Sequence, residues 1–201
     1  MTADQTRPSR ATLPASICVS GLNRVSAGSR PYDGQSDVVA GGAVWALSRP
    51  GDPAQELDVN GVYRFADGQV TSLITDLGRP NGIAFSPDLR TMYVSNTEAT
   101  RKVVMAYDVA GDGSVSNGRV FVDATADSSP GMPDGLKVDT QGNVYATAPG
   151  GVWVITPDGR HLGTIQPPEM ATNCAWGDDG RTLYITAETG IYRIKLNATG
   201  N

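Results

Sequence analysis

The chain of 201 residues, with 39% hydrophobic and 18% charged residues, has the composition of a soluble globular protein rather than that of a disordered one. Its formal net charge is -5 and its Lys and Arg residues form no block, which argues against a nucleic-acid partner, because neutralising phosphates requires clustered positive charge. No apolar run approaches the ~20 residues of a membrane span, and the first residues lack the apolar core of a secretion signal. We therefore expect a soluble protein, cytoplasmic as written, with no membrane partner and with a small molecule as ligand.

The N-terminal part of the chain has a different composition from the rest. Residues 1–35 are rich in Ser, Arg and Pro, and only ASICVSGL at 15–22 resembles a strand. We expect a loose segment over residues 1–35 and one β domain over residues 36–201.

From residue 36 onward, short runs of Val, Ile, Tyr and Thr alternate with Gly and Pro, the pattern of an all-β protein. Three stretches share one layout, in which a polar turn, a short strand, a second turn and a second strand follow one another: RPNGIAFSPDLRTMYVS, MPDGLKVDTQGNVYAT and ATNCAWGDDGRTLYIT. They place Tyr93, Tyr145 and Tyr184 in register at intervals of about 40 to 50 residues, which indicates propeller blades. SDVVAGGAVWALS is a weaker fourth copy, with Trp45 in the Tyr position.

Each copy continues with a third strand and an outer hairpin. The third strands are predicted at 61–65, 103–107, 151–155 and 190–194, and ADGQ, GDGS and TPDG mark the outer turns. About four small sheets result, and each must bury a face against its neighbour. The repeated aromatic residues are therefore interpreted as packing rather than as ligand-stacking residues, and Trp176 as a core residue.

The cysteines and the histidine carry little functional signal. Cys18 and Cys174 have neither CxxC nor Cys/His spacing and are expected to be free, mostly buried thiols. His161 would have to serve any Ser-His-Asp triad, but it follows the turn signal TPDG, so we expect a solvated loop residue.

Three polar residues occupy one repeated position. Asn81, Asp134 and Asn173 each stand at the start of a first strand, the strand nearest the propeller axis, and should converge on the central channel. A turn role alone is the simpler interpretation, because Asn and Asp before Gly are turn residues. Their oxygen donors are also those that calcium, magnesium or manganese prefers. An incompletely saturated ion there would polarise an ester carbonyl, so hydrolysis of an ester or lactone is the chemistry that the residues favour.

RPNGIAFSPD, MPDGLKVDTQGNVYAT, PGGVWVITPDGRHLGTI and NCAWGDDGRTLYIT resemble the gluconolactonase and regucalcin family, from about residue 36 to 196. The resemblance implies a six-bladed propeller that hydrolyses sugar lactones with one divalent cation in its channel, calcium before zinc, manganese or magnesium. It implies Asn81 and Asp134 as metal ligands, and Asp134 also as the catalytic residue that takes or relays a proton. Ser36, Asp37 and Asn173 are the implied substrate-binding residues, Ser36 standing where the family has Asn.

The chain departs from the family in two respects. No Glu precedes Glu56, so the family's first-blade Glu ligand has no counterpart. Six units of ~40 to 45 residues would need about 240 to 270 residues, so about two blades are absent. Self-association through open blade edges is therefore expected. A non-catalytic propeller module that binds a sugar, calcium or a protein partner remains the alternative function.

Overall fold

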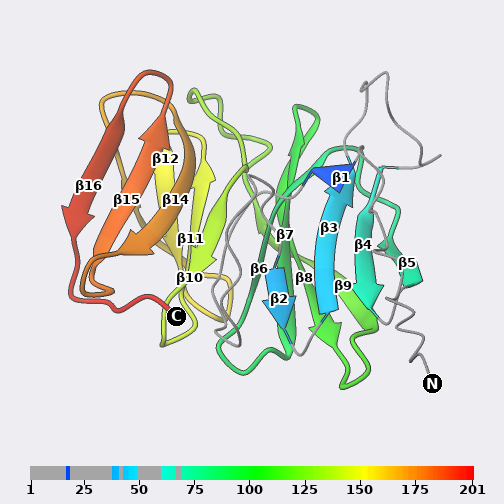
Figure 1. Ribbon diagram of the computed structural model, residues 1–201. Coiled ribbons are helices and arrows are strands. Elements are labelled where there is room, and N and C mark those ends of the chain that lie inside the picture. The colour runs from blue at the N-terminus through cyan, green and yellow to red at the C-terminus, as the bar shows by residue number, and fades with distance from the viewer. Residues whose placement is uncertain (1–16, 19–37, 41–42, 49–59, 67–68) are drawn as a thin grey trace, which may run out of the picture.

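The computed structural model of the protein describes residues 17–18, 38–40, 43–48, 60–66 and 69–201, which form β-strands joined by turns and loops (Figure 1). The prediction of an all-β protein is confirmed, since these residues contain no helix. Accordingly, no helix in this part of the chain is long and apolar enough to cross a membrane. Within the predicted loose segment, Ile17–Cys18 forms a short strand; the rest of residues 1–35 lies outside the described residues.

The strands form four antiparallel sheets, which we number in chain order. The first sheet contains β1 (Ile17–Cys18), β2 (Val38–Ala40), β3 (Ala43–Ser48), β4 (Val62–Ala66) and β5 (Gln69–Ile74). The second contains β6 (Pro80–Phe85), β7 (Thr91–Glu98), β8 (Arg101–Val109) and β9 (Val115–Asp123). The third contains β10 (Leu136–Val138), β11 (Val144–Ala148), β12 (Gly151–Ile155) and β13 (His161–Ile165). The fourth contains β14 (Ala171–Gly177), β15 (Thr182–Ala187) and β16 (Ile191–Lys195).

The register of the strands matches the repeat seen in the sequence. Tyr93, Tyr145 and Tyr184 lie at the same place in the second strand of three sheets, opposite Ala84, Lys137 and Ala175 respectively. Each first strand therefore runs antiparallel to the strand that carries the Tyr, as the layout predicted. The four sheets correspond to the four predicted units, while the number of blades that close a ring stays a prediction.

The outer turns GDGS and TPDG form where the sequence indicated them, whereas residues 67–68 of the predicted ADGQ turn lie outside the described residues. Gly113 between β8 and β9 has a φ of 80°, and Gly159 between β12 and β13 has a φ of 88°. Residues other than Gly adopt this left-handed conformation at a cost, which is why GDGS and TPDG mark reversals.

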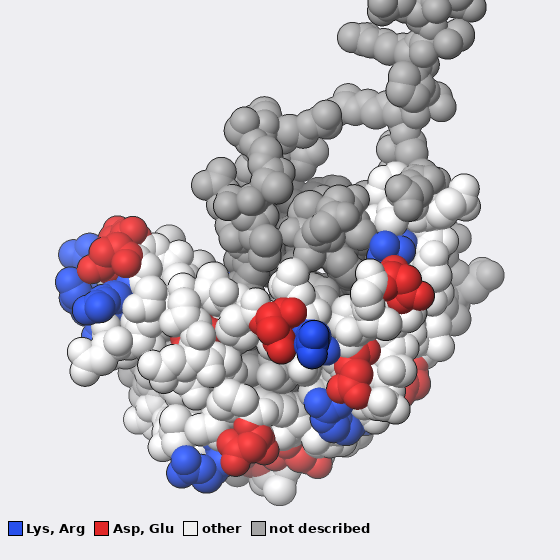
Figure 2. Space-filling model, turned by 90° about the horizontal axis from the view of Figure 1, so that it is seen from below, with Lys and Arg blue, Asp and Glu red and all other residues white. Residues whose placement is uncertain are grey.

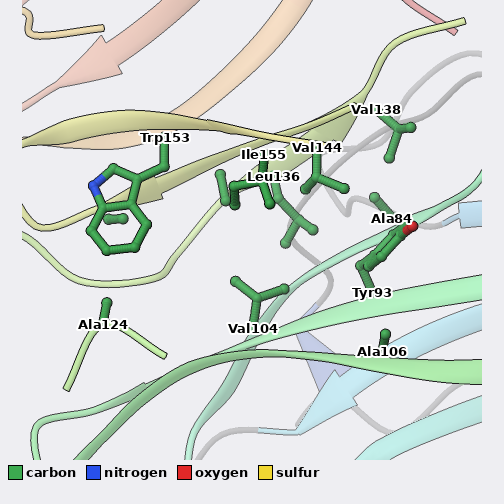
Figure 3. Packing of buried hydrophobic residues seen from close by; sticks show 12 residues of the cluster. Ala84, Tyr93, Val104, Ala106, Ala124, Leu136, Val138, Val144, Trp153 and Ile155 are labelled. Carbon is green, nitrogen blue, oxygen red and sulfur yellow. The ribbon is translucent and has the colours of Figure 1, made fainter. Parts of the chain in front are cut away.

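The core lies between sheets stacked face to face (Figure 1). Between the second and third sheets, Val104 and Ala106 of β8 share one buried cluster with Leu136 and Val138 of β10 (Figure 3). Tyr93 is 4% exposed, and its ring lies against that of Phe121 at an angle of 54° with centroids 4.8 Å apart. Between the third and fourth sheets, Tyr145 meets Trp176 edge to face at 4.9 Å. The prediction that the repeated aromatic residues serve packing is confirmed for Tyr93, Tyr145 and Trp176. Tyr184 is half-buried and donates a hydrogen bond to Asp178 at 2.9 Å.

The structure also places the predicted thiol and imidazole. Cys174 is free and buried in the core between the third and fourth sheets, as expected. His161 is not a loop residue: it opens β13, where it is exposed and stacks on Trp153 at 4.3 Å. His161 pairs with Ile155 of β12 and its ring stacks on Trp153, which explains why β13 begins directly after the turn.

The face of the molecule seen from below carries acidic and basic side chains interspersed in small groups (Figure 2).

Candidate active site

The three polar residues singled out in the sequence lie at the beginnings of neighbouring first strands. Asn81 is the second residue of β6, Asp134 precedes β10 by two residues, and Asn173 is the third residue of β14. The Gly135 N–H donates to the carbonyl of Thr172 at 3.1 Å, which links the third sheet directly to the fourth.

Two glycines allow these turns to touch. A Cβ added to Gly82 would overlap the backbone oxygen of Asp134, and a Cβ added to Gly135 would overlap the side chain of Asn173. Only glycine fits where one backbone approaches the next this closely. The Gly that follows Asn81 and Asp134 in the sequence is thus required for spacing between sheets, and the contacts run in the order Asn81, Asp134, Asn173.

Asn81 is held from β7. It is 6% exposed, and its Nδ2 donates a hydrogen bond to Oγ1 of Thr97 at 2.9 Å. The same hydroxyl donates to the carbonyl of Pro133 at 2.6 Å. One side chain of β7 therefore binds both the Asn81 turn and the turn that carries Asp134.

The backbone of Asp134 is held on both sides. Its N–H donates to Oγ1 of Thr147 at 3.1 Å, and its carbonyl accepts from Oγ of Ser95 at 2.6 Å. Ser95 in turn accepts from the Gly82 N–H at 2.6 Å. Ser95 and Thr147 are both 0% exposed, so water does not compete for these bonds. The position of the Asp134 turn is thereby fixed before any ligand binds.

These hydroxyls form a second repeat that our sequence analysis missed. Ser95, Thr147 and Thr186 each stand two residues after the repeated Tyr, in YVS, YAT and YIT. Each bonds the polar turn of its own or the next sheet, Thr186 by donating to the carbonyl of Asn173 at 3.4 Å. These residues could have been predicted from the sequence, because a Ser or Thr recurs two positions after each repeated Tyr.

The amide oxygen of Asn173 is engaged by the backbone of its own strand. Its Oδ1 accepts from the N–H of Cys174 at 2.8 Å, a bond within its own strand. The amide nitrogen is then the end of the side chain that suits a ligand, as a donor to a hydroxyl or carbonyl oxygen. This arrangement agrees better with contact to a substrate than with a metal ligand.

A buried lysine lies behind the Asn173 strand. Lys137 is 3% exposed; its Nζ donates to the carbonyl of Leu136 at 3.0 Å. Burial lowers the pKa of Lys137 below its ordinary 10.5, and the nearby thiol of Cys174 opposes this shift. Burial raises the pKa of Cys174 to about 11, so its thiol stays protonated and unreactive at neutral pH.

We expect Lys137→Met to raise the melting temperature at pH 7. The pKa of Lys137 is lower in the folded protein than in the unfolded chain, so the unfolded chain binds the lysine proton more readily. Lys137 therefore destabilises the folded state, and increasingly so as the pH falls below 10.5. The gain from Lys137→Met should therefore shrink as the pH is raised toward 10.5, as thermal melts across that range would show. The control is Lys195→Met, since Lys195 forms an exposed ion pair with Asp179 and should have little effect. A lower melting temperature for Lys137→Met at pH 7 would contradict this account.

The donor set fits a hard cation better than a soft one. Asn81 and Asp134 offer an amide oxygen and a carboxylate, the ligand types that calcium and magnesium prefer, and neither His nor Cys contributes. The described part of the chain contains no group of three or more His, Cys, Asp or Glu that could hold an ion, and of the two predicted ligands Asp134 is the one with a carboxylate. Ser36, Asp37 and Glu56 lie outside the described residues, and the role of the first two stays a prediction.

Comparisons with known proteins agree on one family. The sequence model of the SMP-30/Gluconolactonase/LRE-like region matches residues 18–189. The chain is 36% identical over 153 residues to the gluconolactonase of Zymomonas mobilis, covering 73% of this chain and 43% of that protein.

Two solved structures show the same fold. A gluconolactonase from Xanthomonas campestris superposes with a TM-score of 0.68 at 30% identity, over 85% of this chain and 60% of that one. A calcium-binding regucalcin from Agrobacterium tumefaciens superposes with a TM-score of 0.67 at 25% identity, over 80% and 59%. The chain spans about half the length of the curated relatives it matches.

Proposed function

Because the chain belongs to the SMP-30/Gluconolactonase/LRE-like family, we propose that it hydrolyses sugar lactones with the help of one divalent cation bound by Asn81 and Asp134. The observation that carries this proposal is the contact between the two turns, in which Gly82 lies against the backbone of Asp134. The contact brings together the two turns that carry Asn81 and Asp134, which supports a shared ion site.

We propose further that the four sheets are blades of a six-bladed propeller. The solved relatives are longer than this chain, which covers 60% of one and 59% of the other. Among the described strands, none pairs with the outer edge of β16, so this edge is where a further strand or a second copy would add.

Calcium is the proposed cation. It accepts amide and carboxylate oxygens in flexible geometry, and a relative of similar fold is named as a calcium-binding protein. When bound, the ion would draw charge from the lactone carbonyl and stabilise the oxyanion formed on attack by water.

The chain's own residues would supply the remaining steps. Asp134 accepts a proton from the attacking water, whose oxygen bonds to the carbonyl carbon. The ring C–O bond then breaks, and the ring oxygen takes up a proton to give the open hydroxy acid. Asn173, through its amide nitrogen, donates a hydrogen bond that orients the sugar, together with Ser36 and Asp37 from outside the described residues.

Proton release from glucono-1,5-lactone tests the proposal. In a pH-stat at constant pH, the protein with added calcium should release acid faster than the uncatalysed reaction. A chelator should remove the excess rate, and calcium, manganese or zinc in excess of the chelator should restore it to different degrees. A rate equal to the uncatalysed one under every metal condition would rule out the lactonase function.

The alternative function is a non-catalytic module that binds a sugar, calcium or a protein partner. If Asn81 and Asp134 were the only protein ligands, the site would hold an ion weakly, and such a module would then be the better description. Calcium binding measured by calorimetry, combined with no excess lactone hydrolysis, would identify this alternative.

A further inference from the structure

We propose that Thr97 is a positioning residue that sets the orientation of the Asn81 amide, so that the carbonyl oxygen of Asn81 is directed to the cation. The inference rests on the proposed function, because it concerns how the same ion would be held. It assigns a role to a residue that binds neither the ion nor the substrate.

The direction of two hydrogen bonds determines the amide orientation. The hydroxyl of Thr97 has one proton, and the carbonyl of Pro133, 2.6 Å away, can only accept it. The hydroxyl oxygen can therefore only accept from Asn81, and it must be the amide nitrogen that faces Thr97 at 2.9 Å. The Asn81 carbonyl oxygen consequently lies at the end of the amide away from Thr97, and it is this oxygen that would serve as the cation ligand.

Thr97 is not part of the structural repeat. The residues four positions after the repeated Tyr in the third and fourth sheets are Pro149 and Glu188, neither of which has a hydroxyl. The repeated hydroxyls Ser95 and Thr147 bond backbone groups, whereas Thr97 also bonds a side chain. Blade assembly accounts for the bond from Thr97 to Pro133, whereas a need to orient Asn81 accounts for the bond between Thr97 and the Asn81 amide.

The same hydroxyl couples the two proposed ligands. Pro133 immediately precedes Asp134, so the chain of hydrogen bonds runs from the Asn81 amide through Thr97 to the Asp134 turn. Partners that orient metal ligands in this way typically contribute about 10- to 100-fold in metal affinity.

Thr97→Val tests the inference, because Val keeps the shape and removes the hydroxyl. In calorimetric titrations with Ca²⁺, we expect Thr97→Val to weaken binding by about 10- to 100-fold, and Thr97→Ser, which retains the hydroxyl, to bind within about threefold of the wild type. Thr125→Val is the matched control: Thr125 lies two residues after β9 and accepts a hydrogen bond at 3.0 Å from the Lys102 N–H of β8, and the loss of this bond should leave Ca²⁺ affinity unchanged.

A second background separates orientation from general stability. A carboxylate has equivalent oxygens at both ends, so Asn81→Asp needs no partner to orient it. In an Asn81→Asp protein, adding Thr97→Val should not weaken Ca²⁺ binding, whereas a merely structural Thr97 would weaken it in both backgrounds. Should Thr97→Val not fold, Thr97→Ala takes its place in both.

The outcomes are distinguishable. Absence of Ca²⁺ binding by the wild type overturns the proposed cation site itself, and with it the basis for this role of Thr97. Binding by the wild type with equal affinity in Thr97→Val overturns the role of Thr97 alone, as does an equal loss in the Asn81 and Asn81→Asp backgrounds.

Discussion

Asp134→Asn is expected to lower kcat/KM for glucono-1,5-lactone by at least about 10³-fold, since it removes both the carboxylate that Asp134 contributes to the proposed cation site and the proton acceptor. The substitution preserves the shape of the side chain, and the turn is held through its backbone by Ser95 and Thr147, so the fold should persist. Initial rates in a pH-stat, with thermal melts of the same samples, would measure both effects.

The control for this experiment is Asp179→Asn. Asp179 forms an exposed ion pair with Lys195 at 3.2 Å and lies outside the proposed site, so its loss should leave the rate unchanged. Full activity of Asp134→Asn at saturating calcium would contradict the assignment of Asp134 as ligand and base.

Gly82→Ala should destabilise the protein by about 3 kcal/mol, because the added Cβ would overlap the backbone oxygen of Asp134 and the side chain of Leu136. Backbone cannot move aside as a flexible side chain does, so relief requires the second and third sheets to separate. For a chain of this length the melting temperature should fall by roughly 6 to 12 °C. Calcium affinity should fall as well, since the same separation moves Asn81 away from Asp134.

Gly111→Ala provides the comparison for Gly82→Ala. A Cβ at Gly111 meets no atom within 4 Å, so this variant loses a glycine without a clash. It should melt close to the wild type. If both variants melted alike, the close contact between the Asn81 and Asp134 turns would be wrong.

Periodicity explains why much of the fold could be predicted. The repeated Tyr, with its turn signals, placed the sheets correctly because strand alternation and positive-φ turns are local properties of the sequence. The polar positions could be found for the same reason: Asn81, Asp134 and Asn173 occupy one place in the repeat, and that place lies at the start of adjoining first strands.

The features that sequence reasoning missed depend on contacts between sheets. Lys137 was not distinguished from solvated lysines, because its burial results from the fourth sheet covering the face that it shares with Tyr145. The reason for glycine at positions 82 and 135 was likewise taken as turn geometry, whereas the structure shows a close approach to the backbone of Asp134 at Gly82 and to Asn173 at Gly135. Thr97 was missed because it departs from the repeat, and a search for repeated residues passes over such a position.

Anomalous diffraction from crystals grown with Mn²⁺ in place of calcium would test the cation site most directly. The account predicts a single strong peak that lies within about 2.1–2.6 Å of both Oδ1 of Asn81 and a carboxylate oxygen of Asp134. A peak that touches neither residue, or no peak near them at saturating Mn²⁺, would contradict it.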